Sequence, residues 1–178
     1  MQLVPPRNRS RGRRFGEVEI AAAVALGASV LAVAVPTFAR NLHSSRFVEP
    51  VTGLKRIGAA AVAYARTRPV AQAFPASAPL TPATAPRGRC EVDAPGLWDR
   101  PTWVALDFRP SAPDEPHCFA FGFDSALSPA RSTFRAHAHG DLDGDGITST
   151  FEVTGQAVDG DPHGPTLDPG MFVDSEVE

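Results

Sequence analysis

The sequence predicts an α+β fold in which a long N-terminal helix packs on a four-stranded antiparallel sheet. An apolar segment near the N-terminus runs into a stretch with apolar residues every three or four positions, which is typical of one long helix. In the second half of the chain, four short segments alternate apolar and polar residues between turn residues, which is typical of antiparallel strands with one buried face. A helix on such a sheet forms a two-layer domain.

The first expected elements are a basic leader, residues 1–14, and an apolar segment, residues 15–39. The leader holds five arginines, and Glu19 is the only charge between Val18 and Ala39. About twenty apolar residues suffice for a helix to cross a bilayer core, and flanking cations stay on the cytoplasmic side. We therefore expect a single-pass inner-membrane protein with a cytoplasmic N-terminus and a periplasmic or extracellular C-terminal domain. An ordinary membrane anchor with no further role is the alternative.

The spacing within this segment resembles the N-terminus of type IV pilins and pseudopilins. Phe15 stands at the place of the family's first mature residue, Glu19 at its membrane-embedded glutamate and Pro36 at its helix-kinking proline. The resemblance implies a structural subunit of a type IV pilus or of a type II secretion-like filament, anchored in the membrane before assembly. It implies inner-membrane lipids, other pilin-like subunits and a prepilin peptidase as partners, with Glu19 neutralising the N-terminal amine of a neighbouring subunit. Arg14 departs from the glycine that ends the family's leaders.

Residues 40–68 are expected to form the amphipathic half of the same helix. Pro50 should bend this helix or remove one of its hydrogen bonds, and Pro69 should end it. The apolar stripe consists of Phe47, Val51, Leu54, Gly58, Ala61 and Ala65.

Residues 69–101 are rich in proline and alanine and are expected to form a loop region. Cys90 and Cys118 are the only cysteines of the chain. In the oxidising compartment expected for this part of the chain, an isolated pair predicts one disulfide. Two free, buried thiols are the alternative.

Residues 102–178 are expected to hold the antiparallel sheet, an acidic loop and a C-terminal tail. The four strand-like segments are 102–108, 118–123, 132–139 and 150–154. In the third segment, alternation places Phe134, Ala136 and Ala138 inward and Arg135, His137 and His139 outward.

The acidic loop between the third and fourth segments fits the twelve-residue calcium-loop pattern. Its ligand positions are Asp141, Asp143, Asp145, Ile147 (through its carbonyl) and Glu152, with glycine at the sixth position. The flanks alternate like strands, so we expect a hairpin tip in which Ca²⁺ has a structural role, and an extended flank could turn Glu152 away. The alternative is a solvated Asp-Gly turn without metal.

Two weaker features complete the picture. His137 and His139 share a strand face and could ligate a transition metal together with Asp141, or simply face solvent. After Arg135 the chain has ten acidic residues and no Lys or Arg, which argues against nucleic-acid binding.

No catalytic motif is present, so we expect no enzyme. The alternative function is an N-terminally anchored, calcium-stabilised extracytoplasmic binding module that does not polymerise, which Arg14 favours.

Overall fold

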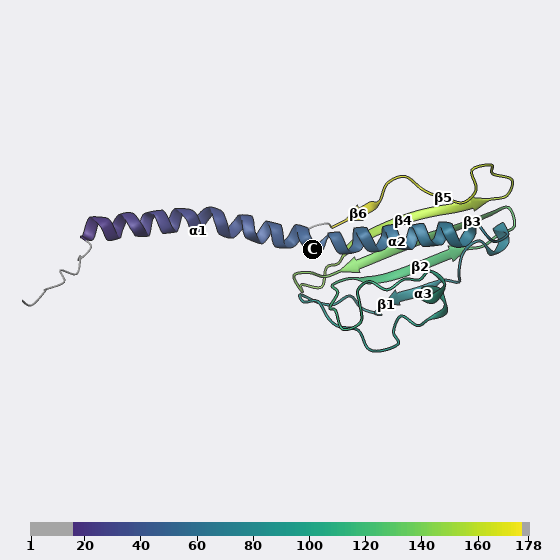
Figure 1. Ribbon diagram of the computed structural model, residues 1–178, viewed down its shortest axis with the longest axis horizontal. Coiled ribbons are helices and arrows are strands. Elements are labelled where there is room, and N and C mark those ends of the chain that lie inside the picture. The colour runs from purple at the N-terminus through teal and green to yellow at the C-terminus, as the bar shows by residue number, and fades with distance from the viewer. Residues whose placement is uncertain (1–15, 176–178) are drawn as a thin grey trace, which may run out of the picture. The chain divides into compact units, whose positions relative to one another are not determined.

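The computed structural model describes residues 16–175, and its contacts divide the chain into two compact units, Met1–Leu42 and His43–Glu178. Helix α1, Glu17–Arg46, forms most of what is described of the first unit. The second unit contains helix α2, Val48–Ala65, and the sheet (Figure 1).

The expected membrane-spanning helix is wrong. In the described part of the chain, no helix is long and apolar enough to cross a membrane. The apolar run of α1 from Ile20 to Val35 has sixteen residues, seven of them alanine. At 1.5 Å per residue it is about 24 Å long, against ~30 Å for a bilayer core. The single-pass inner-membrane localisation was inferred from the same segment and is wrong as well.

The continuous helix expected over residues 15–68 is interrupted at Phe47, which separates α1 from α2. Pro50 explains the break. Inside a longer helix its ring would collide with the carbonyl of Arg46, four residues earlier, and it has no N–H to donate. In the structure Pro50 falls in the first turn of α2, where backbone N–H groups have no intrahelical acceptor and the missing donor costs nothing.

The sheet of the second unit is antiparallel, as expected, but has six strands rather than four. They are β1 Ala78–Thr81, β2 Ala120–Ala126, β3 Arg131–Gly140, β4 Ser149–Val158, β5 Thr166–Leu167 and β6 Phe172–Asp174. The strand order is β1-β2-β3-β4-β5, and β6 also pairs with β4. The central meander of β2, β3 and β4 contains two of the predicted strand segments, 132–139 and 150–154, and overlaps a third, 118–123. Strands β1, β5 and β6 are too short for alternation to reveal them.

The first predicted strand segment, residues 102–108, is wrong. It contains a short helix, α3, Pro101–Ala105, with proline at the start, where a missing N–H costs nothing. Trp103 and Leu106 are three positions apart and both are buried, which is helical rather than alternating spacing. A positive φ of 46° at Asp107 then reverses the chain. The expected loop region also holds a 3₁₀ turn, η1, Val70–Gln72, besides β1.

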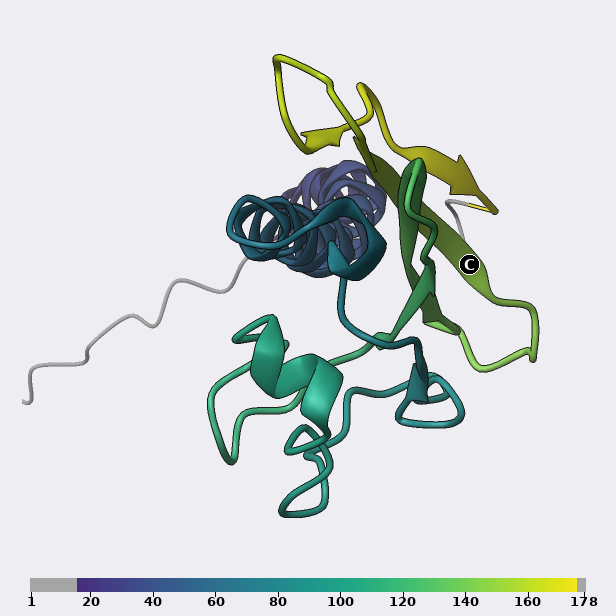
Figure 2. The ribbon, with the colours of Figure 1, turned by 90° about the vertical axis from the view of Figure 1, so that its right-hand side faces the viewer.

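Helix α2 covers one face of the sheet, as Figure 2 shows in a view along the helix. Its predicted stripe is confirmed for Leu54 and Ala61, which are fully buried. Two glycines let the sheet approach closely: a Cβ on Gly53 would lie 2.6 Å from the ring of Phe121, and one on Gly58 would lie 2.7 Å from Leu167. The core below the helix is largely aromatic, with Trp98, Trp103, Phe108, Phe119, Phe121, Phe123, Phe134 and Phe151 buried.

Candidate functional site

The acidic loop joins β3 to β4 at one end of the meander, as the alternating flanks predicted. Asp141, Asp143 and Asp145 each place one carboxylate oxygen within 4.8 Å of the others. Asp141 is buried, whereas Asp143 and Asp145 are exposed. The structure therefore brings together the first three predicted ligands.

The loop's own backbone holds these carboxylates in place. The Asp141 carboxylate accepts hydrogen bonds from the N–H groups of Gly144, at 2.8 Å, and Gly146, at 3.2 Å. Asp143 Oδ1 accepts one from Asp145 N–H at 3.1 Å, and Asp145 Oδ1 one from Ile147 N–H at 2.7 Å. Three acidic groups close together repel one another, so aligned N–H dipoles are needed to hold this turn.

Glu152, the last ligand position of the predicted calcium loop, is not gathered with the aspartates. Glu152 lies within β4, in register with His137, and its Oε1 is 3.6 Å from Arg135 Nη1. Ile147, which was predicted to bind through its carbonyl, donates its N–H to Asp145 within the loop. The extended flank thus separates Glu152 from the aspartates. The three carboxylates present still fit a hard divalent cation, which prefers oxygen ligands and completes its shell with water.

Arg87 and Gly88, in the loop region, contact the acidic loop at Asp141. Gly88 N–H donates to the Asp141 carbonyl at 2.8 Å, and Arg87 Nε lies 3.9 Å from Asp141 Oδ2. Gly88 and Gly144 have positive φ values of 65° and 84°, and a Cβ on Gly144 would lie 3.4 Å from the Cα of Gly88. The two loops can approach this closely because neither glycine has a side chain. The buried Asp141 is therefore held by N–H groups of its own loop and by Gly88 of the neighbouring loop.

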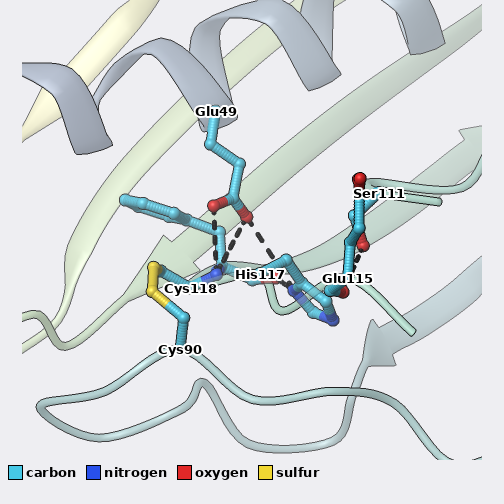
Figure 3. Close-up of a disulfide and its surroundings, with 7 residues drawn as sticks. Glu49, Cys90, Ser111, Glu115, His117 and Cys118 are labelled. Carbon is cyan, nitrogen blue, oxygen red and sulfur yellow. Dashed lines mark hydrogen bonds and ion pairs between the residues drawn. A yellow bond between two sulfur atoms is a disulfide. The ribbon is translucent and has the colours of Figure 1, made fainter. Parts of the chain in front are cut away.

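The predicted disulfide is confirmed. Cys90 and Cys118 are bonded across a separation of 28 residues, linking the loop region to the residue pair that precedes β2 (Figure 3). No other cysteine exists in the chain.

Glu49, in the first turn of α2, reaches down to this disulfide, as Figure 3 shows. Its carboxylate accepts hydrogen bonds from Cys118 N–H, at 3.0 and 3.1 Å, and from Phe119 N–H at 3.1 Å. Burial raises the pKa of Glu49, while these backbone hydrogen bonds and nearby His117 act in the opposite direction. One side chain thus joins the helix to the start of β2.

His117 extends the network on the far side of Glu49. Its Nδ1 lies 2.7 Å from the Phe119 carbonyl, and its Nε2 lies 2.6 Å from Asp93 Oδ2. The Trp98 indole N–H donates to the same Asp93 oxygen at 2.5 Å. The ring is only 2% exposed, so these contacts are made away from water. The arrangement is a structural network that ties the loop region to the sheet.

Sequence reasoning missed this network. Glu49, Asp93 and His117 are separated by 44 and 24 positions, and no motif spacing connects them. The one available signal was the acidic residue in the first helical turn, which ordinarily indicates only a favourable interaction with the helix dipole.

Of the residues expected to act in assembly, Phe15 lies outside the described residues. Glu19 and Pro36 both lie within α1, which is helical at both positions. The two outward histidines of β3 lie half-buried on the sheet face opposite α2. Comparison of the chain with models of known protein families, with curated proteins and with solved structures found no match.

Proposed function

We propose that this chain is a structural subunit that assembles into a pilin-like filament by packing its α1 helix against the α1 helices of other copies. The observation that carries the proposal is the exposed apolar surface of α1. Val24, Leu26, Val30 and Leu31 have exposed fractions of 65%, 69%, 63% and 62%.

These side chains do not form a single stripe. Val24 and Leu26 are two positions apart and therefore project from nearly opposite sides of the helix, and Val30 and Leu31 are about 100° apart. A helix that is apolar all round is normally buried among other elements. The rest of the chain buries α2 on the sheet, and other copies of α1 have the matching apolar surface to cover this one.

The resemblance of the N-terminal segment to pilins supports the same proposal. A filament core of packed helices tolerates the acidic side chain of Glu19 only when an opposite charge or a proton neutralises it. A processed Phe15 amine of a neighbouring copy would supply that charge.

Replacing Val30 with Glu should abolish assembly of the full chain, because each copy would place a charge inside the helix core. Val104→Glu is the matched control: Val104 is equally exposed, at 63%, but lies on α3. Sedimentation and electron microscopy of both variants report assembly. If Val30→Glu assembles as well as Val104→Glu, the proposal fails. Under the same assay, Glu19→Ala should slow assembly.

We further propose that Ca²⁺ binds the three-aspartate cluster and stabilises the tip of the β3–β4 hairpin. Adding Ca²⁺ should raise the thermal midpoint, since only the folded loop gathers the carboxylates. Asp143→Asn should remove most of this rise while retaining the acceptor oxygen used by Asp145 N–H. Asp159→Asn, which changes an exposed acid outside the cluster, is the control.

The thermal midpoint in calcium and in magnesium is the measurement. Mg²⁺ should have the smaller effect because it loses its water ligands reluctantly. A midpoint that millimolar Ca²⁺ leaves unchanged, or that rises equally in Asp143→Asn, would show that the cluster is a solvated turn.

A further inference from the structure

We propose that the peptide bond between Asp161 and Pro162 is a self-cleavage site, at which the Asp161 carboxylate attacks its own backbone carbonyl and releases Pro162. The bond lies in the loop between β4 and β5, within residues 160–164. Pro162 and the following His163 are exposed, so the bond is open to water. The activity depends neither on the metal nor on the filament proposed above.

An aspartate that precedes proline has a restricted chemistry. Before any other residue, the backbone nitrogen of that residue can lose its proton and attack the side chain, which forms a cyclic imide. Pro162 has no N–H, so this route is closed. The remaining route runs in the opposite direction: the carboxylate attacks the backbone carbonyl carbon and closes a cyclic anhydride. Nucleophile and carbonyl belong to one residue, so the attack is unimolecular.

The turn after β4 holds Asp161 in the conformation that this attack needs. Its Oδ1 accepts a hydrogen bond from His163 N–H at 2.9 Å, which folds the carboxylate toward the peptide group that follows it. Its carbonyl oxygen accepts one from Gly164 N–H at 3.1 Å. This donor polarises the carbonyl and stabilises the negative charge that the attack places on the oxygen. Positive φ values of 72° at Gly160 and 69° at Gly164 close the turn around the bond.

The reaction also needs a proton on the proline nitrogen. As the carboxylate oxygen bonds to the carbonyl carbon, the C–N bond breaks and leaves its electron pair on the nitrogen of Pro162. The protonated imidazole of His163, the next residue along the chain, donates the proton directly or through one water. Water then opens the anhydride and returns a proton to His163. Asp161 ends with two carboxyl groups, and the sum of the steps is hydrolysis of one peptide bond.

The other Asp–Pro bond of the chain, Asp168–Pro169, lacks these features. The carboxylate of Asp168 accepts a hydrogen bond from Thr154 Oγ1 at 2.7 Å, which holds it toward strand β4. Gly170 follows the proline, so no imidazole is adjacent to the leaving nitrogen. The chain thus contains its own comparison: the bond after Asp161 should break, and the bond after Asp168 should remain.

The test is incubation of the purified full chain in a mildly acidic buffer, in which imidazole is protonated. The products are residues 1–161 and 162–178, and the second carries β5 and β6, which pair with β4. The sample is therefore denatured before mass spectrometry. We expect both fragments to accumulate with time, with Pro162 as the new N-terminus. The rate should not depend on protein concentration, as befits a reaction within one chain.

Three variants assign the roles. Asp161→Asn retains the oxygen that accepts the His163 N–H but removes the nucleophile, so it should abolish cleavage. His163→Gln should slow cleavage at least about 10-fold, because a general acid contributes that much or more. Asp168→Asn is the matched control and should cleave after Asp161 at the unchanged rate. Cleavage should also slow when the unchanged chain is unfolded in denaturant, because the turn is then lost.

Thermal unfolding identifies any variant that has lost its fold; if Asp161→Asn does, His163→Gln decides. A folded chain that stays intact overturns the proposal, as does an unchanged rate in folded Asp161→Asn or His163→Gln. Equal cleavage after Asp161 and Asp168, or equal rates in the folded and the denatured chain, would overturn it too, because both results indicate ordinary acid hydrolysis of Asp–Pro bonds.

Discussion

Replacing both Cys90 and Cys118 with alanine should lower the free energy of unfolding by about 3–4 kcal/mol. The bond closes a loop across a separation of 28 residues, and restricting the unfolded chain over that length accounts for this magnitude. It also holds the loop region, where η1 and β1 contribute little regular structure of their own. Denaturant titration of the two chains measures the difference.

Reduction provides the control for this prediction. A thiol reductant should destabilise the unchanged chain by a similar amount and have no effect on the double-alanine variant. A loss below about 1 kcal/mol would mean that aromatic packing alone holds the loop region to the sheet.

Replacing Glu49 with alanine should lower the free energy of unfolding by about 3 kcal/mol. The change leaves the N–H groups of Cys118 and Phe119 without their acceptor, and each buried, unpaired donor costs about 1–3 kcal/mol. Glu115→Ala is the matched control, because this carboxylate is exposed and, among the described residues, accepts one long bond, from Ala112 N–H at 3.4 Å. Equal losses in the two variants would contradict the proposed role of Glu49.

The pH dependence of the same site has a definite sign. Burial raises the pKa of Glu49 above its ordinary value of 4.5, so between that value and the folded pKa the native state holds a proton that the unfolded chain has released. The protonation-linked part of the stability that Glu49 contributes is therefore fully present below the ordinary value and is lost as pH rises through the folded pKa. Glu49→Gln removes this titration, and the stability advantage of the unchanged chain over it should shrink toward neutral pH.

Local pattern was sufficient for the two longest strands of the fold. Alternation located β3 and β4 and assigned Phe134, Ala136 and Ala138 to the buried face, because a ten-residue strand repeats its signal several times. In residues 102–108 apolar side chains fall on both sides, so period two and a short helix fit equally well. In this segment the proline at the start of α3 favours the short helix over a strand.

The candidate sites, like the strands, were predictable where their residues lie close together in the sequence. The aspartates at positions 141, 143 and 145 are local, and their spacing was enough to bring them together. Glu152 was misassigned because the loop pattern presumes a helix after the sixth position, and a strand places the twelfth residue beside His137 instead. The contacts of Glu49 depend on how α2 packs on the sheet, which no local pattern contains.

Both edges of the sheet limit what can be added to it. On one side β1 has four residues, one of them Pro79, which has no N–H to offer a further strand. On the other side, β5 and β6, of two and three residues, cover the opposite ends of the ten-residue strand β4. A bare β4 would be a long template for a foreign strand, the usual starting point of edge-to-edge aggregation. The edges of this sheet thus discourage strand-to-strand aggregation into fibres, a route separate from the helix packing proposed above.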